Sequence, residues 1–81
     1  MTSGIVIFDI HGMTKYQAEN YLDNQLKMVH SSVYQVKVIH GFHGGTQLRE
    51  MVRNTYAYHP KVKRIDMGAN PGETILILRE L

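Results

Sequence analysis

Two apolar runs that each end in histidine and glycine constrain the fold more strongly than any other feature of this chain. The first run, Ile5 to Ile10, precedes His11-Gly12, and the second, Val33 to Ile39, precedes His40-Gly41. Both have the length and apolar character of β-strands, and a stretch with helical periodicity follows each of them. The sequence therefore predicts a strand–helix–strand–helix order over its first two thirds.

The two predicted helices have clear start and stop signals. The first runs from about Lys15 to His30, and Thr14 and Gln17 have the spacing of a capping box at its start. The second begins near Thr46, after a glycine-rich loop, and ends before Pro60, because the residue before a proline disfavours the helical region. Both stretches carry apolar residues at helical spacing, so each has one face to bury.

The last third of the sequence predicts a β-hairpin. Its strands are Val62 to Met67 and Thr74 to Leu78, and the segment Gly68-Ala69-Asn70-Pro71-Gly72 between them is dense in turn residues. The expected fold is a two-layer α/β sandwich, in the order β-α-β-α-β-β, with two helices on one face of a four-stranded mixed sheet. The run from Ile5 to Ile10 is apolar on both alternating faces, which favours a central place for it in that sheet.

Length and composition limit the classes of protein to which this chain can belong. The 81 residues are expected to form one domain, residues 1–81, and 43% of them are apolar, which is enough for a modest core. The absence of cysteine excludes disulfides and thiolate metal sites and fits a cytosolic protein. We see no signal-peptide pattern and no apolar segment of about 20 residues, and expect no membrane contact. A net charge of +2 is compatible with a polyanionic partner but does not require one.

The two histidine motifs are expected to meet at one edge of the sheet. Loops that follow parallel strands joined by helices emerge at the same edge, and ligands bind there in open α/β sheets. Asp9 and His11 share a face of the first strand, roughly 6.6 Å apart along it, and a carboxylate this near an imidazole can orient the ring. We therefore expect Asp9, His11 and His40 to converge, although the facing of His40 depends on the strand register.

The loop after the second predicted strand has the features of an anion site. It reads Gly41-Phe42-His43-Gly44-Gly45 and leads into a helix N-terminus, where free N–H groups and the helix dipole favour a phosphate. Arg49 and Arg53, in the first two turns of that helix, are placed to reach a neighbouring phosphate. Phe42 is an aromatic residue that could stack on an unpaired base.

Two further groups of residues allow more than one interpretation. Lys61, Lys63 and Arg64 lie within four residues of one another and form either a solvated strand face or an extension of the phosphate track. Three histidines with an aspartate could also form a zinc site, but His11 and His40 come from different strands, so their spacing neither supports nor excludes a metal. We expect no cofactor and no resident metal, with a divalent cation as the alternative.

Together the motifs resemble those of the Smr (small MutS-related) domain. That family has an aspartate-leucine-histidine-glycine signature after its first strand and a histidine-glycine-x-glycine signature after its second. The matching segments here are Asp9-Ile10-His11-Gly12 and His40-Gly41-Phe42-His43. Shorter cues agree with this resemblance, and they are Thr14, Leu48-Arg49, His59-Pro60 and the glycine-rich hairpin. The resemblance extends from about Ile5 to Leu81.

The resemblance implies a fold similar to the C-terminal domain of translation initiation factor three. It also implies association with nucleic acid, with nicking of DNA or cleavage of RNA in several members. Carried over by position, the functional candidates are Asp9, His11, His40 and Gly41. One departure concerns the loop, because His43 stands where the family has its second glycine, and Gly44-Gly45 follow it. This difference bears on cleavage more than on fold or binding.

Three functions are compatible with these observations. The first is a nuclease that cleaves RNA or nicks DNA, with RNA as the favoured interpretation, in which His11 and His40 exchange protons with the attacking and leaving oxygens and Asp9 orients His11. Backbone amides of the glycine-rich loop, with Arg49, would stabilise the developing charge. The second is a nucleic-acid-binding module without chemistry. The third is a protein-interaction domain, including a homodimer, that uses the uncovered face of the sheet.

Overall fold

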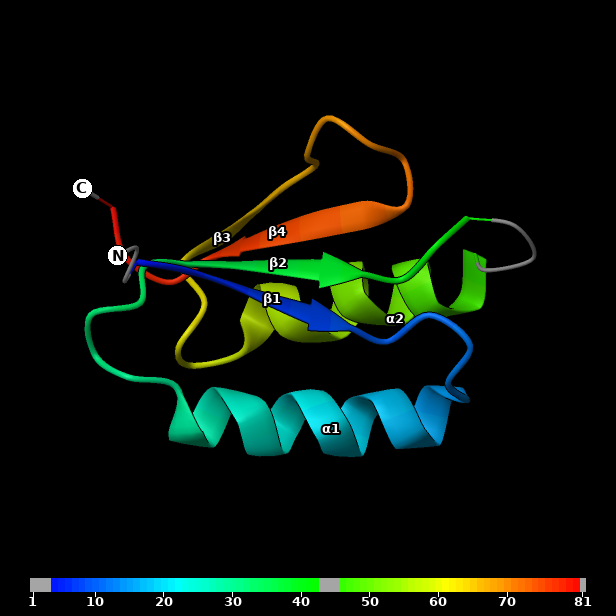
Figure 1. Ribbon diagram of the computed structural model, residues 1–81, viewed down its shortest axis with the longest axis horizontal. Coiled ribbons are helices and arrows are strands. Elements are labelled where there is room, and N and C mark those ends of the chain that lie inside the picture. Colours follow the sequence, from blue (N-terminus) through cyan, green and yellow to red (C-terminus); the bar gives the residue numbers. More distant parts are fainter. Residues whose placement is uncertain (1–3, 43–45, 81) are drawn as a thin grey trace.

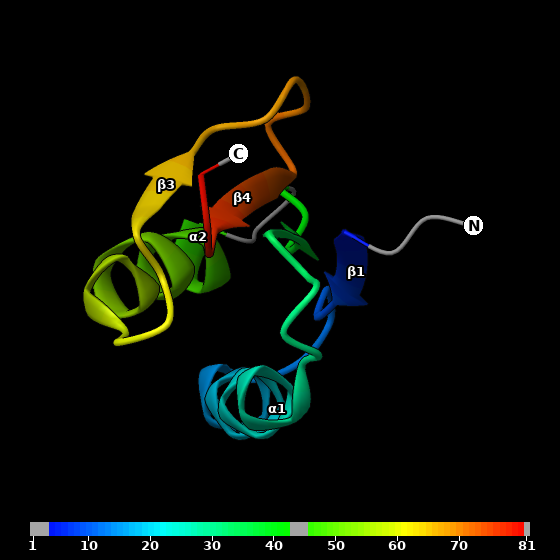
Figure 2. The same cartoon turned by 90° about the vertical axis from the view of Figure 1, so that its left-hand side faces the viewer.

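The structure is a computed structural model that describes residues 4–42 and 46–80. Two helices cover one face of a four-stranded sheet, as Figures 1 and 2 show. The elements are β1 (Ile5–Asp9), α1 (Lys15–Met28), β2 (Gln35–Ile39), α2 (Thr46–Thr55), a 3-10 turn η1 (Tyr56–Tyr58), β3 (Arg64–Asp66) and β4 (Glu73–Ile77). The predicted two-layer α/β fold and the predicted element order are therefore confirmed.

The order of strands in the sheet is β1-β2-β4-β3. β1 and β2 are parallel, and β4 is antiparallel to both β2 and β3. The central position expected for the first strand is wrong, because β1 lies at an edge. Its apolar character on both faces reflects Ile5 and Ile7, which lie on the face without helices and are 41% and 58% exposed. The two central places belong to β2 and to β4, and β4 is buried on both faces.

The helix boundaries follow from local hydrogen bonds. Thr14 Oγ1 accepts the Gln17 N–H and Gln17 Oε1 accepts the Thr14 N–H, which confirms the predicted capping box. The first helix ends at Met28, two residues earlier than expected, since Val29 is already extended. The ammonium group of Lys61 donates to the Leu26 carbonyl at 2.5 Å and so satisfies one of the last carbonyl groups of α1.

The core lies between the sheet and the two helices. Inward-facing side chains of the sheet meet apolar stripes on both helices. Full burial of one such aliphatic side chain contributes about 1.5–3 kcal/mol. The sheet supplies Phe8, Val36, Val38 and Leu76, α1 supplies Ala18, Leu22 and Leu26, and α2 supplies Leu48, Met51 and Val52. None of the helices in the described ranges is long and apolar enough to span a membrane.

The strand register brings the two histidine motifs to the same edge of the sheet. Asp9 pairs with Ile39 at the ends of β1 and β2, so the segments that follow leave the sheet side by side. β4 begins at this edge, because Glu73 is the antiparallel partner of Ile39. Three chain segments therefore meet where β1 and β2 end and β4 starts (Figure 1).

Candidate functional site

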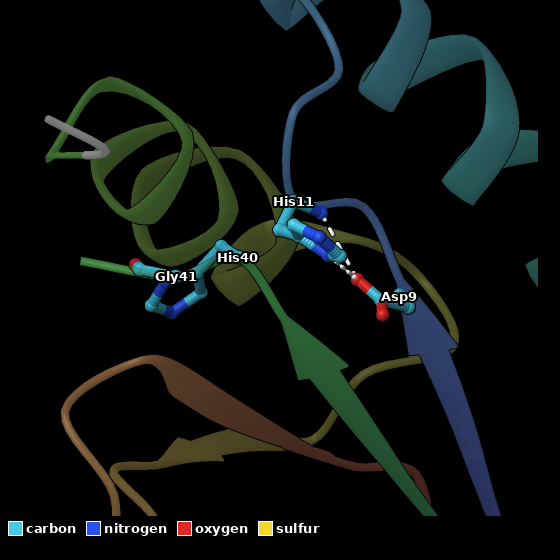
Figure 3. A network of polar contacts seen from close by, with 4 residues as sticks. All are labelled: Asp9, His11, His40 and Gly41. Carbon is cyan, nitrogen blue, oxygen red and sulfur yellow. Dashed lines mark hydrogen bonds and ion pairs between the residues drawn. The ribbon is translucent and has the colours of Figure 1, made fainter. Parts of the chain in front are cut away.

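Asp9 and His11 form a close, solvent-exposed pair at the end of β1. His11 Nδ1 lies 2.5 Å from Asp9 Oδ1, and the His11 backbone N–H donates to the same oxygen at 3.1 Å (Figure 3). These hydrogen bonds, the side-chain one first, hold the pKa of the Asp9 carboxyl below its usual value. Because a carboxylate only accepts, Nδ1 of His11 carries a proton, and Nε2 is the ring nitrogen that remains to exchange a proton with a ligand.

His40 has the opposite environment. Its side chain is 2% exposed and faces the helices, on the same side of the sheet as Val36 and Val38. Asp9 lies on the exposed face, so Asp9 and His40 do not meet. The structure thus brings His11 to Asp9 and, across a shared cavity, to His40, but it does not bring all three side chains together (Figure 3).

Both ring nitrogens of His40 have hydrogen-bond partners. Nδ1 lies 2.7 Å from the Gly41 carbonyl oxygen, which only accepts, so Nδ1 carries a proton. Nε2 lies 2.8 Å from Thr74 Oγ1, which in turn accepts a hydrogen bond from Arg53 Nε at 3.0 Å. The donors align if Arg53 donates to Thr74 and the Thr74 hydroxyl donates to Nε2 of a neutral His40.

The charges around His40 also favour its neutral form. Burial lowers the pKa of His40, and the guanidinium groups of Arg53 and Arg49 lower it further. The hydrogen bond to the Gly41 carbonyl and the carboxylate of Glu73 act in the opposite direction and are outweighed. At neutral pH the ring is therefore uncharged, with each nitrogen committed to a neighbour.

The backbone after β2 is fixed by the start of the hairpin strand. The Gly72 carbonyl accepts the N–H groups of both His40 and Gly41 at 2.9 Å. Gly41 has a φ of +77°, which favours glycine, and a Cβ at this position would lie 3.7 Å from His11 Cβ. This turn therefore places His11 directly against the glycine of the second motif.

A cavity of about 670 Å³ opens between the two histidine motifs. His11, His40 and Gly41 line it together with Gln47 and Leu48 from α2. The turn before β4 closes it from the other side with Asn70, Gly72 and Glu73. Phe42, which sequence analysis predicts as a stacking residue, also lines the cavity and is 47% exposed.

The two arginines of α2 have different surroundings. Arg53 reaches the sheet and binds Thr74, so its Nε is committed to the buried hydrogen-bond chain. Arg49 Nε is buried and has no hydrogen-bond partner within the described residues, while its terminal nitrogen lies 3.9 Å from Glu50. Arg49 is therefore the arginine with more capacity to bind an anion.

The predicted basic cluster lies at the opposite end of the strands from the two histidine motifs. Lys61 and Lys63 line a second cavity of about 390 Å³, near the C-terminal end of α1 and the end of β4. Lys61 is occupied by the α1 carbonyl groups, and Arg64 binds Glu80 at 2.8 Å. A ligand in the first cavity would therefore contact this basic cluster only if it were long enough to reach across the domain, whose longest dimension is 33 Å.

Some expectations concern residues outside the described ranges. His43, Gly44 and Gly45 lie there, so their predicted contribution to phosphate binding stays a prediction. Among the residues that the structure does describe, no three histidine, cysteine, aspartate or glutamate side chains are grouped so that they could hold a metal ion.

Sequence reasoning missed the contribution of the hairpin turn and β4 to this site. Thr74, with 0% exposure, binds His40, and Asn70 Oδ1 accepts the Gly72 N–H at 2.8 Å. One signal was present in the sequence: Thr74 is polar and has the same alternation parity as Leu76 in an otherwise apolar strand. A polar residue at an inward position predicts a buried partner.

A family model described as the Smr domain matches residues 8–74. This chain belongs to the Smr domain family, which is associated with nucleic-acid binding and nuclease activity. Comparisons with curated proteins and with solved structures gave no match.

Proposed function

We propose that this Smr domain binds nucleic acid and cleaves a phosphodiester bond with the Asp9–His11 pair. The observation that carries the proposal is the 2.5 Å contact between His11 Nδ1 and Asp9 Oδ1 at the mouth of the 670 Å³ cavity. Asp9 holds the ring in the tautomer whose Nε2 is basic and free to accept a proton. His11 is 67% exposed at its side chain, so a substrate can reach it.

In this proposal His11 takes a proton from the attacking hydroxyl, which is a 2′-OH in RNA or water in DNA. The oxygen attacks phosphorus, and the bond from phosphorus to the leaving oxygen breaks. The leaving oxygen then receives a proton from the protonated His11 or from water. Arg49 and the N-terminus of α2 stabilise the charge on the phosphate. His40 acts as a positioning residue, in place of the second proton-transfer role expected from sequence, because both its nitrogens are occupied.

The test uses labelled single- and double-stranded RNA and DNA. His11→Ala is expected to reduce cleavage by about 10²- to 10⁴-fold. His30→Ala is the matched control, because His30 bonds Ser32 near the end of α1 and lies in the other cavity. Cleavage that persists undiminished in His11→Ala would refute the proposal.

The nucleophile can be identified with one modified RNA. If the 2′-OH attacks, a single 2′-deoxy nucleotide before the scissile phosphate blocks cleavage, and the native product ends in a cyclic phosphate. If water attacks, the substitution has little effect. This experiment separates RNA-specific transfer from hydrolysis that would act on DNA as well.

A non-catalytic binding module is the second candidate. It is favoured by His43 at the position of the family's second loop glycine. It predicts salt-sensitive binding to nucleic acid without turnover, and cleavage that His11→Ala abolishes would exclude it. Homodimerisation through the open sheet face, where Ile5 and Ile7 are exposed, is a separate proposal. A monomer at all concentrations in sedimentation would exclude it.

A further inference from the structure

The hairpin turn before β4 presents a fixed amide to the cavity beside His11. We infer that the amino group of Asn70 donates a hydrogen bond to one non-bridging oxygen of the phosphate that is cleaved at His11, so that Asn70 is a further catalytic residue. The inference rests on the proposed function and deepens it, because a single donor at one of two non-bridging oxygens gives the reaction a stereochemical preference.

One hydrogen bond determines the orientation of the Asn70 amide. The Gly72 N–H lies 2.8 Å from the side-chain oxygen of Asn70, and because an N–H only donates, this end of the amide is the acceptor. The amino group Nδ2 therefore lies at the other end, where it has no acceptor among the described residues. Asn70 is exposed and lines the cavity, so the amino donors are left for a ligand.

The backbone of the turn is fixed as well. The Asn70 carbonyl accepts the Glu73 N–H at 3.1 Å, and the Gly72 carbonyl accepts the N–H groups of His40 and Gly41 at 2.9 Å. Asn70 is therefore anchored twice, through its side chain to Gly72 and through its backbone to the first residue of β4. A donor that is held in place before the substrate arrives needs no reorganisation during the reaction, which is the property of an oxyanion-stabilising group.

Close packing connects this turn to His11. A Cβ at Gly72 would lie 3.2 Å from Asn70 Oδ1 and 3.3 Å from Gly41 Cα, and a Cβ at Gly41 would lie 3.7 Å from His11 Cβ. The contacts therefore run from Asn70 through two glycines to His11, and both side chains line the same cavity of about 670 Å³. One phosphate in this cavity is thus placed to contact the His11 ring and the Asn70 amino group together.

The charges around the cavity permit an anion. Glu73 is the acidic residue among its described lining residues, and its carboxylate pairs with Lys37 at 3.7 Å on the open face of the sheet. The Asn70 amide carries no charge, so its hydrogen bond to a phosphate oxygen becomes stronger as negative charge develops there in the transition state. The contact is therefore expected to act on the rate of cleavage more than on affinity.

The experiment uses a phosphorothioate at the scissile phosphate of a nucleic acid that the wild-type protein cleaves. Sulfur in place of a non-bridging oxygen is a weak hydrogen-bond acceptor, and the Rp and Sp diastereomers place it at one oxygen or at the other. We expect wild type to cleave one diastereomer about tenfold more slowly than the other in single-turnover assays, because only one of them loses the hydrogen bond from Asn70. Anisotropy of an end-labelled strand reports binding separately from cleavage.

Two variants connect the preference to Asn70. Asn70→Asp keeps the acceptor for the Gly72 N–H but removes the amino donor, and is expected to lower the single-turnover rate about 10²-fold and to remove most of the difference between the diastereomers. Gln47→Glu is the matched control, because it adds the same charge to the same cavity from α2. It is expected to weaken binding but to keep the difference between the diastereomers. Circular dichroism and hydrogen exchange of the Gly72 amide verify that the fold and the turn are intact.

The outcomes separate this inference from the proposed function. Equal cleavage of both diastereomers by wild type would overturn the Asn70 contact and leave the chemistry of Asp9 and His11 intact. A difference between the diastereomers that Asn70→Asp leaves unaltered would overturn the contact as well, and any loss of rate in that variant would then come from its charge. Absence of cleavage by wild type would overturn the proposed function itself, and the contact with it.

Discussion

The Nε2 atom of His40 lies 2.8 Å from the Oγ1 atom of Thr74, so a buried histidine directly after β2 is joined by one hydrogen bond to a buried threonine on the neighbouring antiparallel strand β4. The Gly41 carbonyl already holds the proton on Nδ1 of His40, and the Thr74 hydroxyl occupies the remaining nitrogen, Nε2. This contact also distinguishes the two motif histidines: both carry the proton on Nδ1, but only His11 presents an unoccupied Nε2 within the described structure.

Replacement of Thr74 by valine tests this contact. Valine has nearly the shape of threonine but no hydroxyl, so Nε2 of His40 and Nε of Arg53 both lose a buried partner. We expect a loss of about 1–3 kcal/mol in the free energy of unfolding, measured by urea denaturation. The ¹⁵N shifts of the His40 ring are expected to change, which a purely volumetric effect would not produce.

Thr74→Ser is the matched control, because it keeps the hydroxyl and removes only a methyl group. It is expected to retain the ¹⁵N signature of the wild-type ring. If valine and serine give the same ring shifts, the hydroxyl does not form the hydrogen bond to Nε2 of His40.

Acid should destabilise the domain through His40. Its folded-state pKa lies below the ordinary value of 6.5, mainly because of burial, so the unfolded chain binds the proton first as the pH falls. The stability contribution is complete above pH 6.5 and is lost as the pH falls from there toward the lowered pKa. One such group gives a slope of up to about 1.4 kcal/mol per pH unit in this window.

The measurement is urea unfolding of wild type and His40→Gln at pH 7.5 and pH 5.5. The groups that face the ring are Arg49, Arg53, Thr74 and Glu73, and all are present in both proteins. Wild type is expected to lose more stability on acidification than His40→Gln. An equal loss in both proteins would assign the acid effect to other histidines.

Asp9→Asn is expected to reduce cleavage by about 10²- to 10⁴-fold while nucleic-acid binding changes little. Asparagine keeps the size of the side chain, but its amide can bond the His11 ring in the wrong tautomer, with Nε2 protonated. Single-turnover cleavage and anisotropy together check this expectation. Asp66→Asn, a change to an exposed carboxylate on β3 beside Arg64, is the control and should be neutral.

Tyr56→Phe should destabilise the fold without altering the site. The Tyr56 hydroxyl donates to Asp23 Oδ1 at 2.7 Å and also reaches the Glu19 carbonyl, so it connects η1 to α1. Burial, followed by the Asp23 carboxylate, raises the pKa of Tyr56, which keeps the hydroxyl a donor. We expect a loss of about 1–2 kcal/mol, measured by thermal or urea unfolding.

The control for that variant is Tyr58→Phe, because the Tyr58 side chain is 87% exposed. Its effect should stay within about 0.5 kcal/mol. A comparable loss in both variants would argue against a specific bond between η1 and α1.

Lys63→Ala tests whether nucleic acid extends across the whole domain. Lys63 is exposed at the second cavity, and the longest dimension of the domain is 33 Å, or about ten stacked nucleotides at 3.4 Å each. For oligonucleotides of that length we expect a salt slope that is smaller by about one. A trinucleotide should bind wild type and variant equally, and an unchanged slope for long strands would confine binding to the first cavity.

The sequence predicted the kinds and order of the elements because these depend on local signals. Alternation in β2, the capping box of α1 and the turn residues before β4 are readable from neighbouring positions. The strand order was not readable, since apolar residues on both faces occur in β1 at an edge and in β4 at the centre. Local periodicity does not report which strand is adjacent to which.

The site was predictable to the extent that it is local. Asp9 and His11 are two residues apart, and their contact follows from strand alternation at the end of β1. The partner of His40 is 34 residues away, on a strand whose register depends on the whole sheet. The alternation of side chains along the second strand left open whether His40 would face Asp9 or the helices. The register of β1 and β2 places the His40 side chain on the side of the helices.

The place of β4 between β2 and β3 has a consequence for biosynthesis. β4 follows both neighbours in the chain yet lies between them. On the ribosome, a nascent chain that still lacks β4 leaves one side of β2 without a strand partner. The His40 ring then lacks the Thr74 hydroxyl, and the N–H groups of His40 and Gly41 lack the Gly72 carbonyl. Since sequence-distant strand pairing is slow to form, the sheet and the buried contacts of His40 should be complete only after translation has passed β4.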